Sequence, residues 1–185
     1  MPPEMSPLQF NQLLEDVSAW WEEHGNVNML KVILSEFKVI PVTVMEDESD
    51  PHFLFNQLRG SGLISRANID VIIEIIVLGG QTGVESKIQK KLPTFPRLNE
   101  VEIKKFSKHR QNLLEFGKAI NKRSRKCIGR LCNLFLRDLK DEWILILKLE
   151  RSHQLTEDPK VKEAFVKILT ENGMVVEANA LNTFP

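Results

Sequence analysis

The sequence predicts an all-α fold for this chain of 185 residues, organised as two small helical bundles in tandem. Apolar residues recur every three or four positions along most of the chain, which is the spacing of one buried face of an α-helix. Nine glycines, nine prolines and no tyrosine argue against a strand-rich sandwich with many turns. A proline-containing segment near the middle interrupts the periodicity, and a comparable order of helices follows it.

The first bundle is expected to begin with two amphipathic helices. Their apolar stripes lie within residues 10–17 and 30–37, and the sequence HGN at 24–26 breaks the pattern between them. Residues 39–50 differ, because they are β-branched at first and then proline-interrupted and acidic. We expect a loop there, with at most one helical turn.

Residues 54–80 are the most apolar part of the chain. Asp50 and Pro51 predict the start of the first helix in this region, because an Asp side chain accepts hydrogen bonds from free amide groups and Pro suits the first turn. The sequence GSG at 60–62 predicts the end of that helix.

The next helix is expected to be a main stabilising element of the first bundle. Ser65 is its expected N-cap, and the pair of glycines at 79–80 ends it. Residues 82–91 then form a last, short helix. The core face of the long helix is expected to consist of Ile69, Ile72, Ile73 and Ile76.

The sequence LPTFPRLNE at residues 92–100 has two prolines and no periodicity. We therefore interpret residues 92–100 as a linker between a first domain at 1–91 and a second domain at 101–185.

Four helices are expected in the second domain. Apolar residues within 113–120 and 128–135 predict the first two, and Asp141 precedes the apolar run of the third at 143–149. Thr156 or Asp158, followed by Pro159, is expected to open the fourth, which stops at Gly173. The apolar residues of this fourth helix are Val161, Phe165, Ile168 and Leu169.

The two halves match one another weakly at a constant spacing. The residues Leu54, Leu58, Ile64 and Ser65 match Leu145, Leu149, Leu155 and Thr156 at an offset of 91, and Ile69, Ile73 and Ile76 match Val161, Phe165 and Ile168 at 92. We interpret this as an internal duplication. The alternative is that any two pairs of amphipathic helices can be aligned in this way.

The net charge of zero conceals an asymmetry between the halves. Residues 1–91 hold 7 basic and 13 acidic residues, and residues 92–185 hold 18 basic and 12 acidic residues, for net charges of −6 and +6. Opposite charges of this size favour attraction between the two halves.

The first half resembles the death effector domain of the death-fold superfamily. The resemblance rests on FNQLLEDVS, MLKVILSEF and DPHFLFNQLRGSGLISRANIDVIIEIIVLGG, and above all on the small turn GLIS between two helices. It covers residues 8–91, and residues 101–181 resemble a second, more diverged copy. The resemblance implies two six-helix death-fold bundles in tandem, as in the prodomains of initiator caspases and their regulators.

This resemblance also implies a function without catalysis. The expected role is an adaptor or regulator of apoptotic or innate-immune signalling, including caspase activation. The expected partners are death effector domain adaptors or caspases, bound through homotypic contacts, and self-association is a further expectation.

The sequence departs from the family pattern at the charge triad. The matching positions of the first domain are Asn26, Gln81 and Gly83, all uncharged, and GMVVE at 173–177 also lacks the acidic and basic pair. The family's exposed aromatic-leucine pair on its second helix falls on Val32 and Ile33. The resemblance therefore implies an apolar patch on the second helix without the charge-triad contacts.

The surplus apolar residues of the fifth helix extend this patch. Val71 and Ile75 project from faces other than the core stripe. We expect an interaction patch that packs against an inter-domain partner helix at 143–149. The patch consists of Val32, Ile33, Val71 and Ile75, and the partner residues are Trp143, Ile144 and Leu147. The alternative is that the extra aliphatic residues are a deeper part of the core.

The sequence names no catalytic residue, no metal ligand and no cofactor. The four histidines lie in different expected elements without the spacing of metal ligands, and no G-x-S-x-G, phosphate-binding loop or caspase-type Q-A-C-x-G is present. The four carboxylates within residues 46–50 fit a solvated loop, because a calcium loop needs a longer ligand pattern.

A basic segment supports an alternative function, that of a nuclear or nucleic-acid-binding helical protein. Residues 97–137 hold 12 basic and 3 acidic residues. The most compact part is NKRSRK, with Lys122, Arg123, Arg125 and Lys126, which suits phosphate backbones or a nuclear import signal. The alternative is a solvated helix start or a rim facing the acidic half, because no aromatic residues interleave the segment.

The expected compartment is the cytoplasm, with the nucleus as a further location. Cys127 and Cys132 offer neither disulfide geometry nor a metal pair, which is typical of a reducing compartment. The start of the sequence does not have the pattern of a signal peptide, and no apolar run is long enough to cross a membrane, so no membrane partner is expected.

Overall fold

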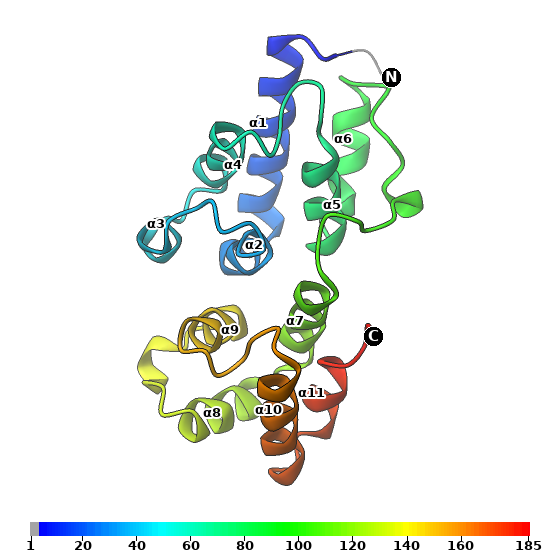
Figure 1. Cartoon of the computed structure of the whole chain (residues 1–185). Helices are drawn as coiled ribbons and strands as arrows, with labels where there is room; N and C mark the ends of the chain where they lie inside the picture. The colour runs from blue at the N-terminus through cyan, green and yellow to red at the C-terminus, as the bar shows by residue number, and fades with distance from the viewer. Residues whose placement is uncertain (1–3) are drawn as a thin grey trace. The chain divides into compact units, whose positions relative to one another are not determined.

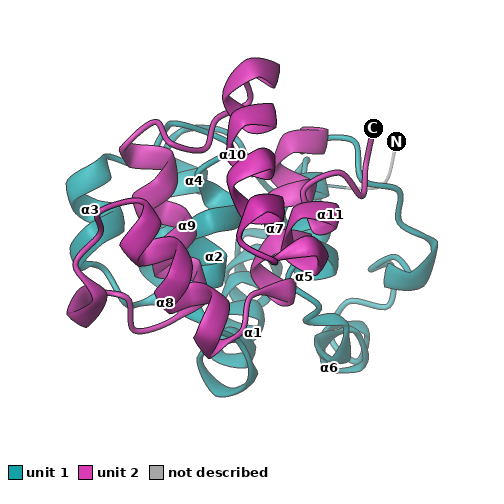
Figure 2. Ribbon diagram, turned by 90° about the horizontal axis from the view of Figure 1, so that it is seen from below, with its two compact units in different colours: residues 1–106 teal, residues 107–185 magenta. Residues whose placement is uncertain are grey.

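A computed structural model describes residues 4–185, and over this range the protein is all-helical. It contains eleven α-helices, α1 to α11, and three short 3₁₀ turns, but no β-strand within those residues. The chain divides into two compact units, Met1–Phe106 and Ser107–Pro185, which Figure 2 colours teal and magenta. The prediction of an all-α fold is confirmed.

Unit 1 is built around the long helix α1 (Figure 1). Helices α4 and α6 pack against α1, and α2 packs against α5. Large side chains such as Phe10, Trp21 and Phe55 are fully buried. The helices are α1 (Pro7–His24), α2 (Val27–Leu34), α3 (Val42–Asp47), α4 (Pro51–Gly60), α5 (Asp70–Leu78) and α6 (Glu85–Gln89).

Unit 2 is built around α7, against which α9 and α11 pack (Figure 1). The indole of Trp143, in α9, lies directly against Gly117 in α7, where a side chain larger than hydrogen would clash. The helices are α7 (Lys108–Ala119), α8 (Lys122–Leu131), α9 (Glu142–Arg151), α10 (Pro159–Glu171) and α11 (Val175–Ala180), with a 3₁₀ turn (Leu136–Asp138) between α8 and α9.

The same kinds of residue cap corresponding helices in the two units. In each pair, a side-chain oxygen accepts a hydrogen bond from a free amide group of the first turn. The caps are Ser6 of α1 and Ser107 of α7, Asn26 of α2 and Asn121 of α8, and Asp50 of α4 and Asp141 of α9. Asp158 caps α10, so the second of the two residues proposed from the sequence is the N-cap.

Corresponding helices also end in the same way. After α4, Gly62 has φ of 78°, and after α9, His153 has φ of 56°. In each turn the following residue donates its amide proton to a carbonyl five positions back, Leu63 to Leu58 and Gln154 to Leu149. This is the hydrogen-bond pattern of a helix that ends in a left-handed residue. The two turns are 91 residues apart, as the sequence match predicted.

The ends of α5 and α10 align at a different offset from the predicted one. Gly80 and Gly173 have φ of 67° and 76°, and the bonds from Gln81 to Ile76 and from Met174 to Leu169 repeat at a spacing of 93. Buried Ile72 and Ile76 of α5 therefore correspond to Phe165 and Leu169 of α10, which are also buried. The predicted match of Ile76 with Ile168 is wrong, since Ile168 is 39% exposed.

Two other details differ from the sequence-based prediction. Helix α5 begins at Asp70 rather than after Ser65, because the backbone of Ser65 is instead paired with that of Asn68 in a tight turn. Phe135, which was expected in the apolar stripe of a helix, follows α8 and is 72% exposed.

The segment that we interpreted as a linker belongs to unit 1. Leu92, Phe95 and Leu98 are buried, and the amide group of Leu98 donates to Glu85 at 2.8 Å. Farther along, the amide group of Lys105 donates to the buried carboxylate of Glu74 at 2.8 Å. The units divide after Phe106, whereas the sequence placed the second domain at 101–185.

The left-handed turns lead to a stability prediction. Replacement of His153 by Gly should raise the free energy of unfolding by about 0.5–1 kcal/mol, because Gly adopts a positive φ without the clash of a Cβ atom. Replacement of Gly62 by Ala should lower it by about 1 kcal/mol for the same reason. Urea titration followed by circular dichroism measures both changes, and a loss of stability in His153→Gly would contradict the assigned turn.

Candidate protein interaction surface

The four residues of the predicted apolar patch are all buried. Val32, Ile33 and Ile75 are fully buried, and Val71 is 4% exposed. The second-helix position Asn26, which stands where the family carries an acidic residue, serves as the N-cap of α2. That the patch packs against residues 143–149 stays a prediction.

The predicted partner helix α9 has an interior role in unit 2. Trp143 and Leu147 are buried, and Ile144 is half-buried. Near the end of the same helix, Glu150 forms a 2.8 Å ion pair with the buried guanidinium of Arg110 in α7. Helix α9 therefore contributes both apolar and charged contacts to its own bundle.

Most of the predicted basic patch lies on one exposed face of α8. Lys122, Arg123 and Lys126 are exposed, whereas Arg125 is half-buried and lies 3.5 Å from Glu142 in α9. Arg130 is exposed on the same face and was missed, although its spacing from Lys126 and Lys122, four residues apart along a helix, was a usable signal. Within residues 4–185, none of the exposed four forms an ion pair.

These four cations surround a shallow pocket of about 660 Å³, lined also by Cys127 and Leu131. Helix α8 takes this orientation because Ser124, Ile128 and Gly129 form its buried face. Lys122, Lys126 and Arg130 follow one another at steps of four residues, so their side chains lie together on the opposite side of the helix.

An apolar groove of about 370 Å³ adjoins this pocket. It lies between the end of α8 and α10, and Leu131 lines both depressions. Its apolar lining consists of Leu131, Cys132, Val161, Ala164, Phe165 and Ile168. We call the groove and the neighbouring cations Lys122, Arg123, Lys126 and Arg130 the α8/α10 surface.

The α8/α10 surface corresponds to the predicted patch of unit 1. At the offset of 93 set by the helix ends, Ala164 and Ile168 of α10 occupy the positions of Val71 and Ile75 of α5. The residues of unit 1 are buried, whereas Ala164 and Ile168 are exposed. The predicted patch of unit 1 therefore stays a prediction, whereas the matching positions of α10 are accessible.

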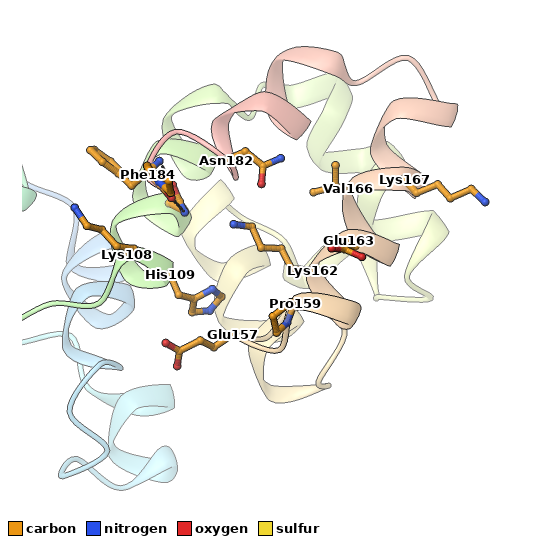
Figure 3. Close-up of a pocket in the computed structure, with 12 residues that line it drawn as sticks. Lys108, His109, Glu157, Pro159, Lys162, Glu163, Val166, Lys167, Asn182 and Phe184 are labelled. Atoms are coloured by element: carbon orange, nitrogen blue, oxygen red, sulfur yellow. Dashed lines mark hydrogen bonds between the residues drawn. The ribbon is translucent and has the colours of Figure 1, made fainter.

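A second pocket of unit 2, of about 610 Å³, lies between α7, α10 and the chain end (Figure 3). His109 and Lys162 point into it, and Lys167 points away. The buried Asn112 holds Phe184 beside it, because its carboxamide accepts from the amide group of Phe184 at 2.8 Å and donates to the carbonyl at 2.9 Å.

The charged groups around this second pocket are of both signs. The pocket is lined by the basic residues Lys108, Lys162 and Lys167 and by the acidic residues Glu157 and Glu163. The ammonium group of Lys108 lies over the ring of Phe184, 5.5 Å from its centroid. The mixture presents no concentrated charge to a ligand, so the α8/α10 surface is the stronger candidate for binding.

Within residues 4–185, no three His, Cys, Asp or Glu side chains are grouped closely enough to hold a metal ion. None of the helices in the same range combines the length and the apolar character that a membrane crossing requires.

The two cysteines lie in different environments, which leads to a prediction. Burial raises the pKa of the Cys132 thiol, and Cys127 is half-buried in the cationic pocket. Iodoacetamide at pH 8 should therefore modify Cys127 roughly tenfold faster than Cys132, because the thiolate is the reactive form. Peptide mass spectrometry over time measures the two rates, and faster modification of Cys132 would show that α8 is oriented differently.

Comparisons with protein-family models, with curated proteins and with solved structures found no match for this chain.

Proposed function

We propose that this chain is a non-enzymatic protein-interaction module made of two death-fold bundles in tandem, of the death effector type. The proposal is supported by the repeated order of helix caps and left-handed helix ends in the two units. Unit 1 has six α-helices, and unit 2 has five with a 3₁₀ turn (Leu136–Asp138) at the place of the third. The resemblance of residues 8–91 to a death effector domain supports the choice of this family.

The α8/α10 surface is the observation that carries the proposal. Ile168 and Leu131 are 39% and 43% exposed, so two aliphatic side chains lie open beside a groove of apolar lining. Removal of such side chains from water drives association, and the neighbouring cations favour an acidic partner surface. In the resembled family, the face of the second and fifth helices is a binding face for another domain of the same kind.

The function is then that of an adaptor or regulator in apoptotic or innate-immune signalling. It acts by bringing death-fold proteins together, with death effector domain adaptors and caspases as the partners. Buried apolar contacts at the groove hold the partner, and the cations of α8 orient it. No step of this function needs a reacting group in the chain.

Ile168→Asp tests the proposed function. The exposed position tolerates the change, so thermal stability should stay within a few degrees of wild type, whereas a charge in the apolar contact should weaken partner binding about 30-fold or more. Purified death effector domains of adaptors and caspase prodomains are passed over the immobilised chain, and binding is measured by surface plasmon resonance.

Val176→Asp is the matched control. Val176 is 69% exposed on α11 and does not line the groove, so the same change there should leave binding intact. The proposal fails if none of the domains binds the wild-type chain, or if the two variants behave alike.

Binding of nucleic acid is the second candidate function, and the four unpaired cations on one face of α8 favour it. If phosphate contacts dominate, the logarithm of the affinity for a 25-base-pair duplex falls linearly with the logarithm of the salt concentration. Lys126→Glu combined with Arg130→Glu should then reduce the steepness of that dependence. Fluorescence anisotropy measures it, and an absence of binding at 50 mM salt would remove this candidate.

A further inference from the structure

The segment that follows α11 is held on unit 2 by a buried side chain. Asn112 in α7 is 1% exposed, and its carboxamide accepts from the amide group of Phe184 at 2.8 Å and donates to the carbonyl at 2.9 Å. The amide and carbonyl groups of one residue point to the same side in an extended backbone, and neighbouring strands pair through them in this way. Asn112 therefore serves as a receptor for one residue of an extended peptide.

Lys108 adds a contact to the side chain of that residue. Its ammonium group lies over the ring of Phe184, 5.5 Å from the centroid, and both side chains border the pocket between α7 and α10 (Figure 3). A cation is attracted to the face of an aromatic ring and gains nothing comparable from an aliphatic side chain. The site thus recognises a peptide group and an aromatic ring at the same position.

The segment beyond α11 is more exposed than the helix that holds it. Leu181 is buried, but Thr183 and Pro185 are exposed and Phe184 is half-buried. Helix α7, in contrast, packs against α9 and α11 and buries seven of its twelve residues. A segment with little buried surface detaches at a lower free energy than a packed helix unfolds. Asn112 therefore stays in place when the segment leaves.

Release of the segment leaves a polar group without partners. The carboxamide of Asn112 then loses one donor and one acceptor beside the buried residues of α7. Such a loss is unfavourable at a buried place, and the amide and carbonyl groups of another extended peptide restore both bonds. The site therefore favours exchange of one segment for another over an empty state.

The pocket has room for more residues than the segment supplies. About 610 Å³ stays open beside Phe184 with the segment in place, a volume in the usual range for ligand sites. His109 and Lys162 point into this space, and Pro159 and Val166 contribute apolar lining (Figure 3). Because charges of both signs line the pocket, a segment of low net charge suits it better than a strongly acidic or basic one.

Unit 1 also binds the chain after its last helix to its first helix, but more firmly. Lys91, which follows α6, donates to both oxygens of the buried carboxylate of Asp16 in α1 at 2.8 Å, and the next residue, Leu92, is buried. Hydrogen bonds between charged groups are stronger than those between neutral ones. Of the two segments, the one on unit 2 is therefore the easier to displace.

We propose that the pocket between α7 and α10 binds an extended peptide segment of a partner protein, of low net charge and with an aromatic residue at the position of Phe184. Residues 182–185 occupy the site as an internal ligand, which the partner segment displaces. Competition with this internal ligand lowers the apparent affinity for the partner.

The pocket lies on a different face of α10 from the α8/α10 surface. Pro159 and Val166 line the pocket, whereas Val161 and Ile168 line the groove. The two pairs are offset by two positions, which is about half a turn of the helix. Peptide binding in the pocket is therefore a property beyond the proposed function and does not depend on it.

A chain shortened after Asn182 tests the proposal with the peptide acetyl-NTFP, which has the sequence of residues 182–185. The shortened chain should melt roughly 4 °C or more below the wild type, because Asn112 loses both partners. About 5 mM peptide should raise this melting temperature by roughly 2 °C or more, since a ligand of the folded state stabilises it. The wild-type chain, whose site is occupied, should gain less than about 0.5 °C.

Two altered peptides identify the contacts. A methyl group on the amide nitrogen of residue 184 keeps the ring but removes the donor to Asn112, so this peptide should lose its effect on the melting temperature. Phe184→Ala in the peptide keeps the amide group but removes the ring, so about fivefold more peptide should be needed for the same effect. Differential scanning calorimetry measures all of these shifts.

Two chain variants serve as controls. Phe184→Ala in the full-length chain retains the segment but weakens its hold, so the unmodified peptide should stabilise this variant more than the wild type; this comparison decides if the shortened chain does not fold. Ile168→Asp in the shortened chain should leave the peptide effect unchanged, because Ile168 does not line the pocket. Circular dichroism verifies the helix content of each variant.

Three results would overturn the inference. They are an equal shift in the wild-type and shortened chains, no shift in either the shortened or the Phe184→Ala chain, and a methylated peptide as effective as the unmodified one. Because Ile168 and Phe184 belong to different sites, any of these results leaves the binding of death effector domains at the α8/α10 surface unaffected.

Discussion

The helices of this protein depend on the apolar faces that they bury, because most of them are too short to be stable alone. Only α1, of 18 residues, exceeds the length at which an isolated helix is marginally stable in water, and α10 follows with 13. In unit 1 the apolar face of α5 is well buried, since six consecutive residues of this nine-residue helix are buried. In α10 the buried residues are Phe165 and Leu169.

This difference between two corresponding helices explains where unit 2 is open. Helix α10 forms because its inner face packs in the bundle, but its other apolar side chains, such as Ile168, remain partly exposed. Helix α8 is similar: its buried residues are Ser124, Ile128 and Gly129, and most of its other side chains are basic. These two helices bury the smallest fraction of their residues in unit 2, and both border the same groove, so the groove is the natural place for a further contact.

The sequence predicted the parts of the fold that local chemistry determines. Asp50, Asp141 and Asp158 cap helices as expected, and the glycines at 79–80 and Gly173 end them, because these residues act on neighbouring backbone groups. The prediction that Ser65 is an N-cap was wrong. Its backbone is instead hydrogen-bonded to that of Asn68 in a tight turn, which residue propensities did not indicate.

The candidate site was predicted less well, because exposure of a side chain depends on distant parts of the chain. The sequence shows that Val71, Ile75 and Ile168 are apolar, but exposure depends on what the rest of the chain places over them. The sequence match used an offset of 92 between α5 and α10, whereas the helix ends give 93. This shift of one residue placed Ile168 at a buried position, although it is 39% exposed. The cations of α8 were easier to find, since a charged side chain without a partner is almost always at the surface.

The carboxamide of Asn112 has a consequence for the end of the chain. Its two hydrogen bonds are made to the backbone amide and carbonyl of residue 184. They therefore do not depend on the side chain at that position. Removal of residue 184 would destabilise unit 2, because the buried amide donor and carbonyl acceptor of the Asn112 side chain would both lose their partners. At residue 184, these two hydrogen bonds therefore depend on the presence of the peptide group and not on the side chain.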